Sequence, residues 1–143
     1  MCVDAFSKWV VLDPLPNRKS KTLAEWFELE ILYKRGLPLL VRTDNGSEWA
    51  KDFVKLCKEY HIRMRKIKPR HSRSNGLAER MVKTVKVYLD KFLRNYPSLE
   101  FDRVVGKIAM VVNALPSAAT GLSPYFIENG KEFRLPILRR LMK

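Results

Sequence analysis

The sequence contains few of the residues that hold a small secreted protein or a zinc module together. It has two cysteines, Cys2 and Cys57, no Cys-x-x-Cys pair, and two histidines, His61 and His71. Two cysteines cannot form a disulfide framework, and these four residues do not have the paired spacing of a structural zinc site. We therefore interpret both cysteines as reduced, packed intracellular thiols.

Long apolar runs are also missing, and the amino terminus has no signal-peptide pattern. A helix that crosses a bilayer needs about 20 mostly apolar residues, so we expect no membrane as a partner and an intracellular location. The 143 residues are nevertheless 46% apolar, which is enough to bury a real core in one compact domain.

Acidic residues are scarce beside basic ones. There are 15 Asp and Glu against 28 Lys and Arg, which gives a formal net charge of +13. A surplus of this size favours a polyanionic partner, because each neutralised phosphate releases condensed counterions. Nucleic acid is the interpretation that the charge favours, and a solvated basic surface or an anionic membrane are the alternatives.

Apolar patterns predict alternating strands and helices. Strands are expected at residues 2–5, 9–12, 39–41 (buried on both faces) and 62–67 (half exposed). Helices are expected from a Thr22–Glu25 capping box to Gly36, and at 49–60, 77–95, 101–114 and from Ser123-Pro124, with a loop at 68–75. This order predicts one α/β domain with a mixed central β-sheet flanked by α-helices, without an internal repeat.

Three carboxylates occupy suggestive positions in this pattern. Asp4 falls in the first expected strand among apolar neighbours, Asp44 follows the third, and Glu79 falls in the first turn of the long helix. Carboxylates suit Mg²⁺ or Mn²⁺, and two such ions can hold both oxygens of a phosphoryl displacement. The alternatives stay open: Asp44 before Asn-Gly is also a turn former, and Glu79 would favour the helix dipole.

Basic residues accompany these carboxylates. Lys83 and Lys86 follow Glu79 by four and seven positions, so the three share one helix face, as a contact with a DNA backbone requires. The simpler interpretation of Glu79 and Lys83 is a surface ion pair. A further basic run upstream is either a DNA contact or a solvated surface: Arg63, Arg65, Lys66, Lys68, Arg70 and Arg73.

Four segments together resemble a known family. VDAFSKWV, TDNGSEW and SNGLAERMVKTVK are similar to the three catalytic blocks of retroviral-type integrases, particularly those of gypsy-like LTR retrotransposons. The later ATGLSPYFIENG resembles the segment that follows the catalytic region in the same elements. The similarity runs in order from Val3 to about Pro136, which is nearly the whole chain.

The resemblance implies an RNase H-like fold and an integrase catalytic core over residues 1–143, with Asp4, Asp44 and Glu79 as both catalytic and metal-binding residues. It implies 3′-end processing of element DNA and strand transfer into target DNA, with Mg²⁺ or Mn²⁺. It further implies homo-oligomers and action on nuclear DNA. The residues expected to contact nucleic acid, with Asn75 in the family's active-site loop, are Lys68, Arg70, Arg73, Asn75, Arg80, Lys83 and Lys86.

The sequence departs from the family pattern in three ways. Only 34 residues separate Asp44 from Glu79, where the family usually has thirty-five, and the 69–73 loop lacks the usual aromatic and His-Pro. Only three residues precede Asp4, so we expect a truncated first strand, with the zinc-binding and carboxy-terminal DNA-binding modules absent. The alternative functions are a domesticated or decayed remnant that binds nucleic acid without catalysis, and another RNase H-like enzyme such as a transposase or nuclease.

Overall fold

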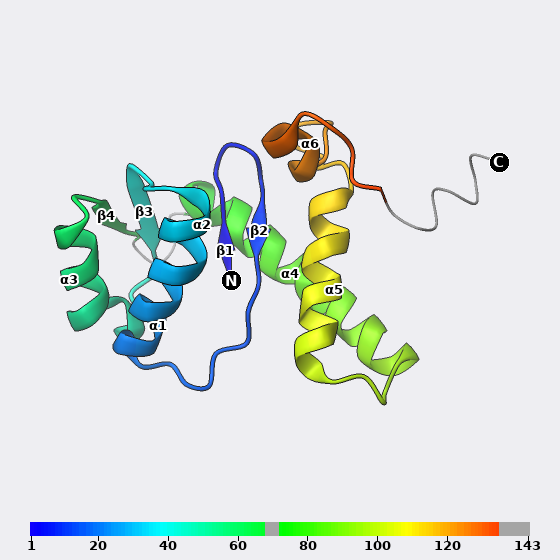
Figure 1. The fold of residues 1–143 in the computed structure, drawn as a ribbon, viewed down its shortest axis with the longest axis horizontal. Helices are drawn as coiled ribbons and strands as arrows, with labels where there is room; N and C mark the ends of the chain where they lie inside the picture. The colour runs from blue at the N-terminus through cyan, green and yellow to red at the C-terminus, as the bar shows by residue number, and fades with distance from the viewer. Residues whose placement is uncertain (68–71, 135–143) are drawn as a thin grey trace. The chain divides into compact units, whose positions relative to one another are not determined.

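The computed structural model describes residues 1–67 and 72–134, which divide into two compact units (Figure 1). The first unit combines Met1–Pro14 with the described part of Leu77–Lys143, and the second is Leu15–Gly76. Each unit has its own apolar core and its own pair of strands. None of the described helices has the length and apolar character needed to cross a membrane.

The first unit begins with a short hairpin. Strands β1 (Cys2–Val3) and β2 (Val10–Val11) pair antiparallel, with Val3 opposite Val10. The turn between them is closed by the Asp4 N–H, which donates to the Trp9 carbonyl oxygen at 2.8 Å. Lys8 makes the reversal in a left-handed conformation with φ 66°, so the chain reverses around Ser7-Lys8, as predicted.

Two helices bury the apolar side of this hairpin. Helix α4 spans Ser72–Asn95 and helix α5 spans Phe101–Ala114. The centre of the core consists of Val10, Val104, Ile108 and Val112, and the three residues of α5 recur every fourth position, so they share one helix face. The α4 side chains packed against them are Met81, Val85, Tyr88, Leu89 and Phe92.

A helix side chain holds the outer edge of β2. Asn113 of α5 is 5% exposed. Its Oδ1 accepts from the Val10 N–H at 2.8 Å, and its Nδ2 donates to the Val10 carbonyl oxygen at 2.8 Å. Because Asp4 and Trp9 pair on the β1 side, the alternation of an antiparallel ladder turns Val10 toward the opposite edge. Asn113 therefore pairs with β2 as a neighbouring strand would.

Helix α6 (Pro124–Asn129) begins as the sequence predicts. The buried Ser123 is its N-cap and accepts from the Phe126 N–H at 2.9 Å, while Pro124 occupies the first turn, where its missing N–H costs nothing. The helix ends at Gly130, which adopts φ 68°, a left-handed conformation that glycine tolerates best.

The second unit packs helices on a parallel strand pair. One continuous helical stretch comprises α1 (Ser20–Phe27), the π-helix η1 (Glu28–Leu32) and α2 (Tyr33–Arg35). After it come β3 (Leu40–Thr43), the 3₁₀ turn η2 (Ser47–Trp49), α3 (Lys51–Glu59) and β4 (Arg63–Lys66), with β3 parallel to β4. The buried core of this unit is Leu23, Ala24, Phe27, Ile31, Leu32, Phe53, Leu56, Cys57 and Ile62.

Helix α3 ends in a hydrogen-bonded reversal that starts β4. The Ile62 N–H donates to the Cys57 carbonyl at 2.7 Å, and the His61 N–H donates to the Lys58 carbonyl at 3.1 Å. This is the Schellman pattern, with His61 at φ 55° in the left-handed position that glycine usually takes. Ile62 is buried directly after it, which fixes the direction of β4.

The cysteines are free thiols in the structure, as expected. Cys57 is buried on the inner face of α3, and burial raises the pKa of its thiol to about 11. Cys57 is therefore protonated and inert near neutral pH.

Three local predictions were wrong. Helix α1 begins at Ser20, so Thr22 lies inside its first turn rather than at the N-cap, and the Thr22 hydroxyl donates to Asn17 Oδ1 at 2.9 Å. Leu39 is 81% exposed, so the third expected strand is not buried on both faces. Residues 72–75 belong to α4 rather than to a loop. The antiparallel and parallel pairings expected of a mixed sheet are both present, each as a two-stranded sheet within the described residues.

Candidate metal and nucleic-acid site

Asp4 presents its carboxylate from the turn that follows β1. It is exposed, so the expectation of a carboxylate inside a buried strand was wrong. Its Oδ2 accepts three hydrogen bonds, from the Phe6 N–H at 3.0 Å, the Ser7 N–H at 2.6 Å and the Ser7 hydroxyl at 2.9 Å. All three converge on one oxygen, which leaves Oδ1 outside the turn.

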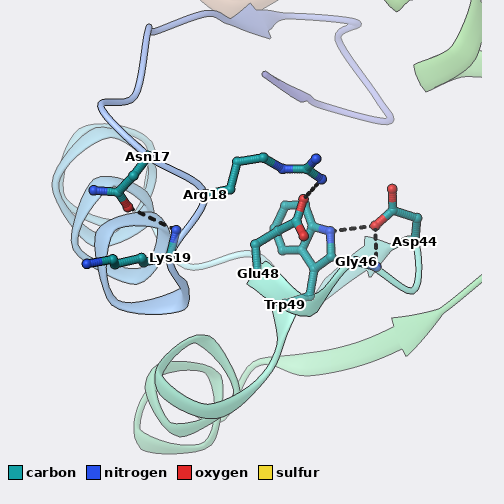
Figure 2. A network of polar contacts seen from close by, with 7 residues as sticks. All are labelled: Asn17, Arg18, Lys19, Asp44, Gly46, Glu48 and Trp49. Atoms are coloured by element: carbon teal, nitrogen blue, oxygen red, sulfur yellow. Dashed lines mark hydrogen bonds and ion pairs between the residues drawn. The ribbon is translucent and has the colours of Figure 1, made fainter.

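Asp44 lies directly after β3, as predicted, and is also exposed (Figure 2). Its Oδ1 accepts from the Gly46 N–H at 3.0 Å and from the indole Nε1–H of Trp49 at 2.6 Å. Both bonds fall on the same oxygen, so Oδ2 is directed away from the turn. Asp44 is a turn former, and it still has a carboxylate oxygen to offer a ligand.

Glu79 lies on the exposed side of α4, nearly two turns from the start of the helix. The prediction of a first-turn position was wrong, because α4 begins at Ser72 and includes the polar residues before Gly76. Stabilisation by the helix dipole is therefore weak at Glu79, since that effect fades beyond the first turn.

Basic residues follow Glu79 along α4. Arg80, Lys83 and Lys86 are all exposed, and Lys83 and Lys86 recur on the Glu79 side of the helix, as their spacing predicts. Arg73 and Asn75 belong to the first turn of α4 by their backbone. Lys68 and Arg70, the other expected nucleic-acid contacts, lie outside the described residues.

A second basic surface lies on the β3–β4 pair, and sequence reasoning missed one of its members. Arg42 is directly opposite Arg65 in the parallel register, and Arg63 is two residues before Arg65, so all three project from one face. All three are exposed, and none forms an ion pair with the acidic residues described in residues 1–67 and 72–134. Facing like charges are destabilising without an anion, and only the register of β3 identifies Arg42 as a member.

The two units divide the expected metal ligands. Asp4 and Glu79 belong to the first unit, and Asp44 belongs to the second. Among residues 1–67 and 72–134, no three His, Cys, Asp or Glu side chains form a group that could hold a metal ion. The donor chemistry of the three residues fits Mg²⁺ or Mn²⁺, because all are carboxylates on exposed side chains, and both aspartates keep one oxygen outside their own turns.

Comparison with protein families matches residues 1–72 to the integrase core domain, which is half of the chain. The match includes Asp4 and Asp44 and ends before Glu79.

Two curated relatives are retroviral polyproteins. The Gag-Pol polyprotein of Walleye dermal sarcoma virus is 27% identical over 137 residues, which is 95% of this chain and 8% of the relative. The Gag-Pro-Pol polyprotein of Human T-cell leukemia virus 2 is 31% identical over 116 residues, 79% of this chain and 8% of the relative. The chain thus spans less than a tenth of either polyprotein. The expected closeness to gypsy-like retrotransposons stays a prediction.

Solved structures show the same fold. The HTLV-2 integrase catalytic core domain, solved in complex with magnesium in a trimeric form, has a TM-score of 0.72 and 28% identity and covers 87% of this chain and 80% of its own. The simian T-cell lymphotropic virus intasome, solved in complex with the PP2A regulatory subunit B56 gamma, has a TM-score of 0.78 and 26% identity and covers 94% of this chain and 48% of its own. Both neighbours contain integrase catalytic cores, so the predicted RNase H-like α/β fold is confirmed.

Proposed function

The chain belongs to the integrase core domain family, and from that premise we propose that it cuts and joins DNA by metal-dependent phosphoryl transfer. The reactions are 3′-end processing of element DNA and strand transfer into target DNA. The observation that carries the proposal is the presentation of two aspartates. Asp4 and Asp44 each follow a strand, are exposed, and bind their own turn through a single oxygen.

We assign Asp4, Asp44 and Glu79 as the residues that hold Mg²⁺ or Mn²⁺. The ions, when bound, supply positive charge that activates a water or 3′-hydroxyl and stabilises the leaving oxygen. The chain contributes fixed carboxylates: the turn donors at Asp4 and Asp44 restrict each side chain to one orientation, which limits reorganisation when phosphate arrives. The magnesium complex of the HTLV-2 core domain supports this assignment.

DNA backbone contacts are assigned to the basic residues on α4 and on the β3–β4 pair. Arg80, Lys83 and Lys86 continue from Glu79 along the helix, and Arg42, Arg63 and Arg65 form the strand-borne face. Lys68, Arg70 and Arg73 remain proposed contacts from the basic run of the sequence, and Asn75 from the family resemblance. The similar structures include dimeric, trimeric and intasome forms, which supports a homo-oligomer acting on paired DNA ends. Action on chromosomal DNA would take place in the nucleus.

The first experiment is Mn²⁺-dependent disintegration, in which a branched DNA substrate is resolved into joined and released strands. We expect the wild-type chain to join strands, and Asp44→Asn and Glu79→Gln to lose joining while they keep DNA binding. Loss in these variants alone would establish chemistry at the proposed carboxylates. A wild-type chain that is folded and binds DNA without joining would contradict catalysis and favour the domesticated or decayed remnant.

The DNA contacts are tested by the salt dependence of binding. Each phosphate contact that is lost reduces the slope of log K against log salt by about 0.9. We expect a shallower slope for Lys83→Ala with Lys86→Ala, and for Arg42→Gln with Arg65→Gln. The matched control is Arg94→Gln with Arg103→Gln, since those arginines pair with Asp90 and Glu100. If the slope of the control falls as far as the slopes of the test variants, the change in salt dependence comes from net charge alone and not from contacts at these residues.

A further inference from the structure

The turn that presents Asp44 is held by a side chain that is not part of the proposed metal site. The bond from Trp49 Nε1–H to Asp44 Oδ1 is 2.6 Å long, and that from the Gly46 N–H is 3.0 Å (Figure 2). A charge-assisted bond of this length is among the stronger side-chain hydrogen bonds. An indole N–H can only donate, so Trp49 can hold the carboxylate without competing with it for a cation.

Aromatic packing fixes the position of the donor. The Trp49 ring meets the Phe53 ring edge to face with centroids 5.0 Å apart, and Phe53 meets Phe27 in the same manner at 5.1 Å. Phe53 is fully buried and Phe27 is 2% exposed. Trp49 is thereby attached to the core of its unit, so the indole N–H has little freedom to turn away from Asp44.

The residue next to Trp49 in the same turn, Glu48, forms an ion pair. Arg18 Nη2 lies 2.6 Å from Glu48 Oε1, and Arg18 lowers the pKa of the Glu48 carboxyl through this hydrogen bond (Figure 2). The Glu48 carboxylate lies so close to Gly46 that a Cβ at position 46 would be 2.4 Å from Oε2. A Cβ there would displace the flexible end of the Glu48 side chain rather than backbone, and the Gly46 N–H faces Asp44.

We propose that Trp49 is a positioning residue for Asp44, holding Oδ1 so that Oδ2 alone is directed to a divalent cation. The inference rests on the proposed function, since it takes Asp44 as a metal ligand. Glu48, next to Trp49 in η2, forms its ion pair with Arg18. Removal of the indole N–H would leave Asp44 with one local donor and free to rotate about its side-chain torsions.

The decisive variant is Trp49→Phe, which keeps an aromatic ring against Phe53 and removes the N–H. Partners that orient a metal ligand typically change metal affinity by roughly 10- to 100-fold. We expect Mn²⁺ affinity, measured by electron paramagnetic resonance of the free ion, to fall at least tenfold in Trp49→Phe. Trp26→Phe, which removes another indole from the same unit, should bind Mn²⁺ like the wild type. Wild-type affinity in Trp49→Phe would overturn the inference.

A second measurement needs no change at Trp49. The chain has three tryptophans, so its indole N–H signals are resolvable by nuclear magnetic resonance. We expect Asp44→Asn to shift the Trp49 indole signal and leave that of Trp26 in place, and Mn²⁺ to broaden the Trp49 signal before that of Trp26. An unmoved Trp49 signal would contradict the hydrogen bond.

The two failures are distinguishable. If the wild-type chain binds Mn²⁺ and joins DNA, and Trp49→Phe does both equally well, the positioning role is contradicted and the proposed function is not. If the wild-type chain binds no Mn²⁺, both the metal assignment and the positioning role are contradicted.

Discussion

Residues 4–9 and residues 44–49 have the same spacing of three side chains and fold differently. DAFSKW and DNGSEW each contain Asp, then Ser three residues later, then Trp five residues later. In the first segment Ser7 is fully buried and donates to Asp4, whereas in the second Ser47 is exposed and Trp49 donates to Asp44. The residue that orients the carboxylate is therefore not determined by spacing.

The residues between explain the difference. Lys8, in the left-handed conformation, reverses the chain, so the Trp9 carbonyl pairs with the Asp4 N–H and the Trp9 ring packs against Tyr125. In the second segment the chain enters the 3₁₀ turn η2 after Gly46, and Trp49 packs against Phe53 of α3. The Asp4 turn is closed by its own neighbours, and the Asp44 turn is closed by the core of its unit.

The largest expected effect comes from removing the hydrogen bonds between Asn113 and the hairpin that presents Asp4. In Asn113→Leu, the buried N–H and carbonyl of Val10 lose their partners, and each such loss costs about 1–3 kcal/mol. We expect the free energy of unfolding in urea to fall by about 2–4 kcal/mol. Asn129→Leu, at an exposed position, should change it by less than about 0.5 kcal/mol. If both substitutions lowered the free energy of unfolding equally, Asn113 would not stabilise the outer edge of β2 as proposed.

A smaller change in the free energy of unfolding is expected for Ser7→Ala, which tests the difference between Ser7 and Ser47. Ser7→Ala removes the hydroxyl that donates to Asp4 Oδ2 and accepts from the Trp9 N–H at 3.2 Å. We expect a loss of about 1–2 kcal/mol in thermal or urea unfolding. The matched substitution Ser47→Ala, at the same distance along the chain from Asp44, should be near neutral because Ser47 is exposed. If Ser47→Ala were the more damaging of the two, the contrast between the turns would be reversed.

Elements with a strong periodic or capping signal were predictable from the sequence. Helix α5 has the expected bounds, because Val104, Ile108 and Val112 repeat at helical spacing. Helix α6 begins where Ser123-Pro124 indicates. The start of α4 was not predictable, because Ser72–Gly76 is polar and carries no apolar repeat, so it resembles a loop.

The candidate site was predictable in its members and not in its geometry. Asp44 follows a strand, as expected, and the exposed lysines share the Glu79 side of α4, whereas Asp4 lies in the turn after β1 rather than within the strand. No sequence signal indicates that Trp49, rather than Ser47, donates to Asp44, because the choice depends on packing with Phe53. Arg42 was missed for a related reason: it joins the basic face only through its register with Arg65.

The bond between Asn113 and Val10 also bears on how the chain behaves among other copies of itself. A strand at the edge of a sheet offers unpaired N–H and carbonyl groups, and such an edge is a template for intermolecular β-pairing and aggregation. Here a helix side chain occupies both groups of Val10 on the outer edge of β2. The hairpin that presents Asp4 is thus closed to strand addition at Val10, and this protection requires one amide rather than a third strand.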